Sequence, residues 1–255
     1  MSYNPFSLEG KTILVTGASS GIGKATAIEC SKLGATVVIT GRNEKRLQKT
    51  YDCLDLCCSQ EHKLLVADLA TDEGIKVIVD SVPELDGLSS NVGIVVSNVP
   101  IKFIKDEVLN DVLNVNALSH IKLVRDLFKK KRLKKGASIV FMASVGGVTA
   151  HNLGNSVYGI SKAALNSFMK FCAVDFSHRG IRCNSVCPGM IMTPMNENNR
   201  TFSEEDYKKD MENYLLKRYG RPEEVALTTA FLLSDASSFI TGASILVDGG
   251  ASIVC

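Results

Sequence analysis

A glycine-rich turn between a short strand and a helix constrains the fold of this chain more than any other feature. Residues 12–15 form a β-branched apolar run that predicts a strand, and residues 21–33 have a helical pattern. The turn between them reads Thr16-Gly17-Ala18-Ser19-Ser20-Gly21-Ile22-Gly23. Glycines at such a turn let the backbone approach a pyrophosphate, and the helix N-terminus favours its charge. The turn therefore predicts a dinucleotide site at the start of an α/β fold.

The same alternation of strands and helices continues along the chain. Further strands are expected at 36–40, 64–67, 88–96, 138–142, 181–187 and 244–247, and helices at 71–81, at 107–128 and around Tyr158. At 255 residues and 45% hydrophobic content, the chain can bury one full core. We expect a single domain over residues 1–255, an α/β fold with a Rossmann-type, doubly wound parallel sheet and helices on both faces.

Composition limits the classes of partner. Lysine and arginine number 29 against 27 acidic residues, and this balance disfavours a nucleic-acid-binding protein. No apolar run reaches the roughly 20 residues of a membrane helix, and the N-terminus lacks a signal-peptide pattern. We expect a cytoplasmic protein with a small-molecule substrate, and no nucleic acid or membrane as partner. The eight cysteines are expected to be reduced and buried, and Cys53, Cys57 and Cys58 lack zinc-site spacing, so no metal site is expected.

A tyrosine and a lysine four residues apart, Tyr158 and Lys162, share one face of the predicted helix. A tyrosine has a reference pKa of roughly 10, and a neighbouring ammonium favours its phenolate form. The pair alone is also an ordinary surface pattern. Ser144, however, follows the strand at 138–142 and so lies at the carboxyl edge of the predicted sheet, where open α/β folds bind ligands.

The turn matches in full the Thr-Gly-x-x-x-Gly-x-Gly motif of the short-chain dehydrogenase/reductase (SDR) family, and the chain resembles that family over nearly its whole length. The resemblance implies that Ser144 hydrogen-bonds the substrate oxygen and that Tyr158 transfers a proton. It also implies that Lys162 holds the nicotinamide ribose and lowers the phenol pKa. Asn116 is the expected fourth member, which holds a water in a proton relay. Asn114 fits less well, because the family places a small hydrophobic residue immediately before the asparagine.

The resemblance implies a nicotinamide cofactor as well. Arg42 follows the second strand with no carboxylate before it, and a guanidinium suits a 2′-phosphate, so NADP(H) is preferred over NAD(H). Alternatively, Arg42 stacks on adenine or faces solvent. The expected cofactor-binding residues are Gly17, Ser19, Ser20, Gly21, Ile22, Gly23, Arg42, Asn43, Asp68, Leu69, Asn91, Gly93, Tyr158, Lys162, Pro188, Gly189, Ile191 and Thr193.

One segment departs from the family. The usual Asn-Asn-Ala-Gly appears here as Ser90-Asn91-Val92-Gly93, and a β-branched Val92 near the adenosine is expected to tighten or shift the cofactor.

Three other features have a functional and a plain interpretation. The polar stretch beginning at Thr193 predicts a substrate lid over about 193–214, or a surface excursion. His151 either touches substrate or faces solvent. The basic run at 129–135 either complements the C-terminal dipole of the preceding helix or docks an acidic acyl carrier.

Taken together, these residues predict an NADP(H)-dependent oxidoreductase that interconverts a ketone and a secondary alcohol, similar to 3-oxoacyl reductases. An NAD-dependent alcohol, sugar or steroid dehydrogenase and a redox-sensing regulator without turnover are the alternatives. By analogy with the family we expect a homo-oligomer, a tetramer or a dimer, that pairs through the helices at 107–128 and 158–177.

Overall fold

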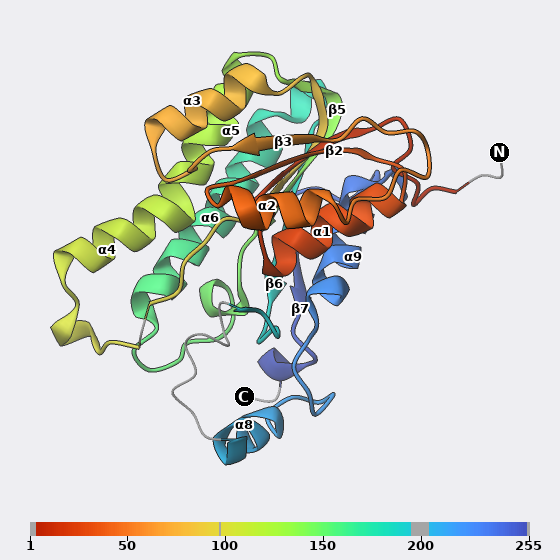
Figure 1. Ribbon diagram of the computed structural model, residues 1–255. Helices are drawn as coiled ribbons and strands as arrows, with labels where there is room; N and C mark the ends of the chain where they lie inside the picture. Colours follow the sequence, from red (N-terminus) through yellow and green to blue (C-terminus); the bar gives the residue numbers. More distant parts are fainter. Residues whose placement is uncertain (1–3, 97, 195–203, 254–255) are drawn as a thin grey trace.

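A parallel sheet forms the centre of the molecule (Figure 1). The computed structural model describes residues 4–96, 98–194 and 204–253. Within these residues seven strands lie in the order β3-β2-β1-β4-β5-β6-β7, and every neighbouring pair is parallel. The predicted doubly wound fold is confirmed. The strands are β1 (Thr12–Thr16), β2 (Thr36–Gly41), β3 (Lys63–Val66), β4 (Leu85–Ser90), β5 (Leu133–Met142), β6 (Arg182–Pro188) and β7 (Ser244–Val247).

The strand order reverses at β1, which lies between β2 and β4. The chain builds the sheet outward from β1 to β3, and then returns to add β4 on the other side of β1. In open α/β sheets, ligands bind outside the carboxyl ends of the strands at such a reversal. The fold thus predicts the position of the site before any side chain is considered.

Alternate residues of β1 face two separate cores. Ile13 and Val15 pack in a cluster with residues of α1 (Gly21–Lys32), α2 (Glu44–Tyr51) and α9 (Pro222–Leu233). Leu14 packs in a second cluster with residues of α3 (Asp72–Ser81), α5 (Ser119–Lys129) and α6 (Ser156–Asp175). Because each fully buried Leu or Ile contributes about 1.5–3 kcal/mol, both faces of β1 hold their helices firmly.

Several elements differ from the sequence prediction. The strand expected at 88–96 ends at Ser90, and the residues beyond it form a loop. The helix expected at 107–128 is divided into α4 (Asp106–Leu113) and α5 by a π-helical turn at Asn114–Leu118. Helices α2 and α9 were not expected. α2 buries only Leu47 and Thr50, too few positions to give an apolar period, and begins at an Asn43 side chain that accepts a hydrogen bond from the Arg46 amide.

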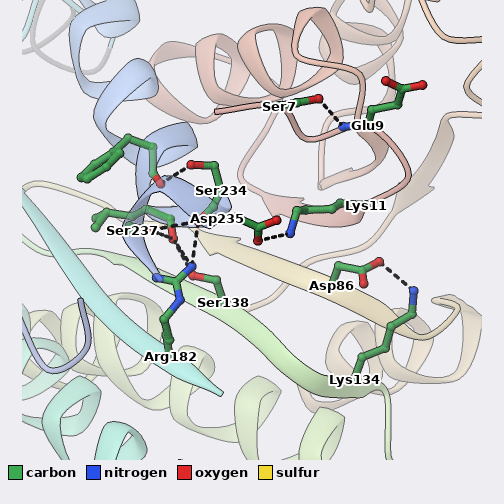
Figure 2. A network of polar contacts seen from close by, with 12 residues as sticks. Ser7, Glu9, Lys11, Asp86, Lys134, Ser138, Arg182, Ser234, Asp235 and Ser237 are labelled. Atoms are coloured by element: carbon green, nitrogen blue, oxygen red, sulfur yellow. Dashed lines mark hydrogen bonds and ion pairs between the residues drawn. The ribbon is translucent and has the colours of Figure 1, made fainter. Parts of the chain in front are cut away.

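A partly buried arginine ties the end of α9 to the sheet (Figure 2). The Arg182 guanidinium, at the start of β6, donates to the carbonyls of Leu232 and Ser234 at 2.9 and 3.1 Å. Ser138 of β5 donates to the same Leu232 carbonyl at 2.7 Å. These donors satisfy carbonyls that the helix end leaves without an intrahelical partner, and the positive charge suits the C-terminal dipole.

The cysteines are free thiols in the described part of the chain. Cys30, Cys172, Cys183 and Cys187 are buried, as expected. The expectation of burial is wrong for Cys53, Cys57 and Cys58, because they lie in the exposed connection between α2 and β3. Among the described helices, none combines the length and the apolar character that a membrane crossing requires.

The predicted lid is described in part. Residues 195–203 lie outside the described residues, and the stretch resumes with α8 (Glu204–Met211). After it, Tyr214 packs edge-on against Tyr219, whose hydroxyl donates to Asp210 at 2.7 Å. The Leu216 amide donates to the Gly249 carbonyl, so this end of the stretch rests on the segment that follows β7.

Candidate active site

The glycine-rich turn is built for close approach of backbone to a ligand. Gly17 and Gly21 have φ values of 64° and 56°, a left-handed conformation that glycine adopts without strain. A side chain at Gly23 would lie 2.4 Å from the Gly17 carbonyl oxygen, so only glycine lets α1 pack against the turn. Ser20, which precedes α1, makes no side-chain cap, and the amides of the first turn of α1 therefore stay available to an anion. These residues fit a pyrophosphate.

The end of β2 presents a guanidinium beside a carboxylate. The Arg42 side chain is 74% exposed, and its Nη1 lies 3.9 Å from Oδ2 of Asp68, which follows β3. The Ala70 amide donates to the other Asp68 oxygen at 3.0 Å, which fixes the carboxylate, while Leu69 is buried beside it. Arg42 therefore has few contacts that hold it and is free to meet a phosphate.

The hydroxyl of Ser144 and the phenol of Tyr158 meet at the carboxyl edge of the sheet. Ser144 comes two residues after β5, and its Oγ accepts a hydrogen bond from the Gly146 amide at 3.1 Å. Burial raises the pKa of the Tyr158 phenol, and the hydrogen bond between the Ser144 and Tyr158 side chains lowers it by less. The net pKa of Tyr158 is raised, so the phenol holds its proton at neutral pH.

Lys162 is 3% exposed and lies one turn further along α6. Its ammonium donates to the Met142 carbonyl at 2.8 Å and lies 5.9 Å from the centre of the Tyr158 ring. Burial lowers the pKa of Lys162 to about 8. The sequence predicts that this cation lowers the pKa of Tyr158. In the structure the pKa of Tyr158 is raised, because burial outweighs the hydrogen bond with Ser144, while the Lys162 ammonium donates to the Met142 carbonyl.

Asn116 is fully buried behind this pair, in the π-helical turn. Its Oδ1 accepts from the Ile94 amide at 2.7 Å, and its Nδ2 donates to the Ile94 carbonyl at 2.9 Å and to Ser161 at 3.0 Å. The alternative, Asn114, faces elsewhere and donates to the Ala70 carbonyl. A π-helical turn often marks a functional position, and here it aims a side chain that an uninterrupted helix would place differently.

A cavity of about 110 Å³ joins the two ends of the site. The structure brings together around it many of the residues expected from the sequence: Ile22, Asn91, Gly93, Ser144, Tyr158, Lys162, Pro188, Gly189, Ile191 and Thr193. Val95, Met142 and Ala143 complete the wall and were not expected. Thr193 also reaches the phosphate turn, because a side chain at Gly21 would lie 3.4 Å from its methyl group.

Two polar residues near the cavity escaped the sequence analysis. Ser161 accepts from Asn116 and donates to the Tyr158 carbonyl at 2.7 Å. His120 is fully buried in the first turn of α5 and binds Ser90 and Val92. Ser161 lies between Tyr158 and Lys162 in the sequence, which is a usable signal. His120 had none, because a single histidine in an amphipathic helix does not reveal its partners.

The structure also places the basic run at 129–135 and His151. The basic run at 129–135 begins at the end of α5, and its last residues lie in the first part of β5. Ser144 follows the far end of the same ten-residue strand, so the run is on the opposite edge of the sheet from the cavity. His151 is exposed, and it lines a separate hollow of about 590 Å³.

Comparison with known proteins gives the same picture over nearly the whole chain. The family model described as enoyl-(acyl carrier protein) reductase matches residues 17–252. The chain is 35% identical to 3-oxoacyl-[acyl-carrier-protein] reductase FabG of Rickettsia felis, over 97% of this chain and 99% of that protein. It is 32% identical to glucose 1-dehydrogenase of Gluconobacter oxydans, over 96% and 92%.

Solved structures share the fold. The crystal structure of a Beutenbergia cavernae protein with bound NADP superposes with a TM-score of 0.87 at 28% identity, covering 97% of this chain and 99% of that chain. The parallel sheet, the glycine-rich turn and the matches in sequence agree, and this chain belongs to the short-chain dehydrogenase/reductase family of oxidoreductases.

Proposed function

We propose that this protein is an NADP(H)-dependent oxidoreductase that interconverts a ketone and a secondary alcohol, working mainly as a carbonyl reductase. The observation that carries the proposal is the meeting of Ser144, Tyr158 and Lys162 at one cavity, with Asn116 directly behind them. A nicotinamide cofactor supplies or accepts a hydride when bound. The chain's own residues would bind the cofactor and the carbonyl substrate and would transfer the proton.

Each polar group has a distinct task in this proposal. Ser144 and Tyr158 would donate hydrogen bonds to the carbonyl oxygen and stabilise the negative charge that develops on it. Tyr158 would then pass its proton to that oxygen, which its raised pKa suits, because the phenol is fully protonated at neutral pH. Lys162 would bind the ribose hydroxyls and replace the lost proton. Asn116 fixes the Ile94 segment, and would let a water connect Lys162 with solvent.

Preference for NADP(H) rests on Arg42. The guanidinium lies at the end of β2, is largely exposed, and within the described residues makes a 3.9 Å ion pair with Asp68. A 2′-phosphate would meet this cation in a charge-assisted, bidentate geometry that a 2′-hydroxyl cannot offer. Arg42→Ala should therefore raise the Kd of NADPH far more than that of NADH in a fluorescence titration. An equal loss for both cofactors would refute the assignment.

The names of two relatives guide the choice of substrates to test. A protein named 3-oxoacyl-[acyl-carrier-protein] reductase and one named glucose 1-dehydrogenase both align along nearly the full chain, so a 3-oxoacyl thioester and a sugar belong in the first substrate panel. Tyr158→Phe should abolish turnover of any substrate found and leave NADPH binding intact. Retained turnover would contradict the mechanism, whereas binding without turnover by the wild type would favour a redox sensor.

We also propose a homo-oligomer without a membrane or nucleic-acid partner, acting in the cytoplasm. Exposed apolar side chains on α6 support self-association, because Ile160, Phe171 and Val174 follow helical spacing on one side of the helix.

The segment 193–214 is proposed to cover bound substrate, since Thr193 borders the cavity and the segment includes α8.

A further inference from the structure

A buried histidine joins two parts of the segment in which this chain departs from its family. His120 is fully buried in the first turn of α5. Its Nδ1 lies 2.6 Å from the Ser90 hydroxyl, and its Nε2 lies 2.8 Å from the Val92 carbonyl oxygen. One ring nitrogen therefore contacts Ser90, the last residue of β4, and the other contacts Val92 in the loop that follows.

The two partners fix the tautomer of the ring. A carbonyl oxygen only accepts hydrogen bonds, so Nε2 carries a hydrogen and donates it to Val92. Nδ1 then accepts from the Ser90 hydroxyl. Burial and the nearby Lys162 ammonium lower the pKa of His120 to about 3, which keeps this neutral arrangement at physiological pH.

The segment that His120 holds touches both ends of the cofactor site. A side chain at Gly17 would lie 3.2 Å from the Val92 amide nitrogen, so Val92 packs against the phosphate turn. A side chain at Gly93 would lie 3.3 Å from the Lys162 ammonium, so the next residue packs against the reaction centre. A shift of Val92 and Gly93 would therefore change the packing at Gly17 and at Lys162 together.

Asn91 and Ile94 hold the same segment from other directions. The Asn91 amide donates to the Thr16 hydroxyl at 3.0 Å, and Asn116 holds Ile94. Between these two anchors, the Val92 carbonyl accepts a hydrogen bond from His120 at 2.8 Å. A partly buried carbonyl that loses its partner is unfavourable, so we expect the loop to shift if the imidazole is removed.

We propose that His120 is a positioning residue for cofactor binding, which holds Val92 and Gly93 between the phosphate turn and Lys162 through its paired bonds to Ser90 and Val92. This inference rests on the proposed function.

The test compares two substitutions at His120 with a matched control. His120→Leu removes both hydrogen bonds, whereas His120→Gln retains one donor and one acceptor. His62→Leu is the control. His62 is also buried with both nitrogens bonded, to the Val37 amide at 3.0 Å and the Asp55 carbonyl at 2.7 Å, but it lies beside the start of β2, away from the cavity. NADPH and NADH Kd values come from fluorescence titration, and Tm from thermal unfolding.

We expect His120→Leu to raise the Kd of both cofactors about tenfold, which corresponds to about 1.4 kcal/mol, and His120→Gln to raise it less than about threefold. The KM for the cofactor should rise in parallel, and the KM for the carbonyl substrate should stay the same. His62→Leu should lower Tm and leave both Kd values unchanged. If His120→Leu does not fold, Ser90→Ala takes its place, because it removes only the donor to Nδ1, and a Kd rise of about threefold is expected.

Unchanged Kd values in the folded His120→Leu or Ser90→Ala protein would overturn the inference and leave the proposed function intact. An equal rise in Kd for His62→Leu would also overturn it, because general destabilisation would then explain the effect. A wild-type protein that binds neither cofactor would overturn the proposed function, and this inference with it.

Discussion

Replacement of Asn116 by alanine would test whether the π-helical turn supports the reaction centre. The substitution removes three side-chain hydrogen bonds, two to the Ile94 backbone and one to Ser161. At a net value of about 1 kcal/mol for each bond, the loss of unfolding free energy is about 3 kcal/mol. For a chain of 255 residues, this corresponds to a fall in Tm of about 6 °C.

The effect on activity should exceed the effect on stability. A side chain at Gly93 would lie 3.5 Å from Asn116 Oδ1 and 3.3 Å from the Lys162 ammonium, so Asn116 and Lys162 hold the same loop. Once Asn116 is gone, the loop would be free to move by a fraction of an ångström, and misplacement on this scale costs up to about 100-fold in rate. We expect kcat to fall at least about tenfold, with Tm and kcat measured on the same preparation.

Asn114→Ala is the matched control for this prediction. Asn114 lies in the same π-helical turn but makes one side-chain hydrogen bond, to the Ala70 carbonyl at 3.0 Å. It should therefore lose about 1 kcal/mol and about 2 °C of Tm, and keep its kcat. Equal losses of kcat in the two variants would refute the reasoning, because they would show that any disturbance of the turn has the same effect.

Two further predictions concern the proton and the phosphate turn. Because the pKa of Lys162 is lowered to about 8, the ammonium is present below that pH and lost above it. Carbonyl reduction should therefore slow as the pH rises through 8. The Lys162→Arg variant keeps its charge and should lack this decline, even if its rate is lower at every pH. A pH profile of kcat/KM that is identical in the two proteins would contradict this. Gly23→Ala should abolish NADPH binding, because the new methyl group would lie 2.4 Å from the Gly17 carbonyl. Gly10→Ala has nothing within 4 Å but a φ of 76°, so it should lose some stability and still bind NADPH normally in the same titration.

The sequence predicts the sheet well because its strands carry their own signal. The run at 244–247 is a strand in the structure with the same bounds, and the glycine-rich turn lies where expected between β1 and α1. The helix α9 escaped prediction because it is apolar on nearly every side, with Val225, Ala226, Ala230, Leu232 and Leu233 all buried, and so gives no polar face from which to read a period.

The sequence predicts which residues form the site, but not the direction in which their pKa values shift. Tyr158 and Lys162 are recognisable from spacing, whereas the direction of each pKa depends on burial, which a linear sequence does not contain. The end of β4 shows the same limit. The sequence predicts one strand from Leu88 to Val96, and only the structure reveals that Asn91 leaves the strand to bond with Thr16, which opens the loop that lines the cavity.

Burial acts on the two catalytic candidates in opposite directions, and the result bears on the favoured reaction. It disfavours the charged form of each group, raising the pKa of the Tyr158 phenol and lowering that of the Lys162 ammonium. Below about pH 8 the pair therefore holds a neutral phenol beside an ammonium, which is the state that donates a proton. Alcohol oxidation needs Tyr158 to accept a proton and therefore to be a phenolate. The raised pKa of Tyr158 makes this form scarce near neutral pH. On the proposed mechanism this protonation state suits carbonyl reduction, and the rate of alcohol oxidation should rise with pH over the range in which reduction slows.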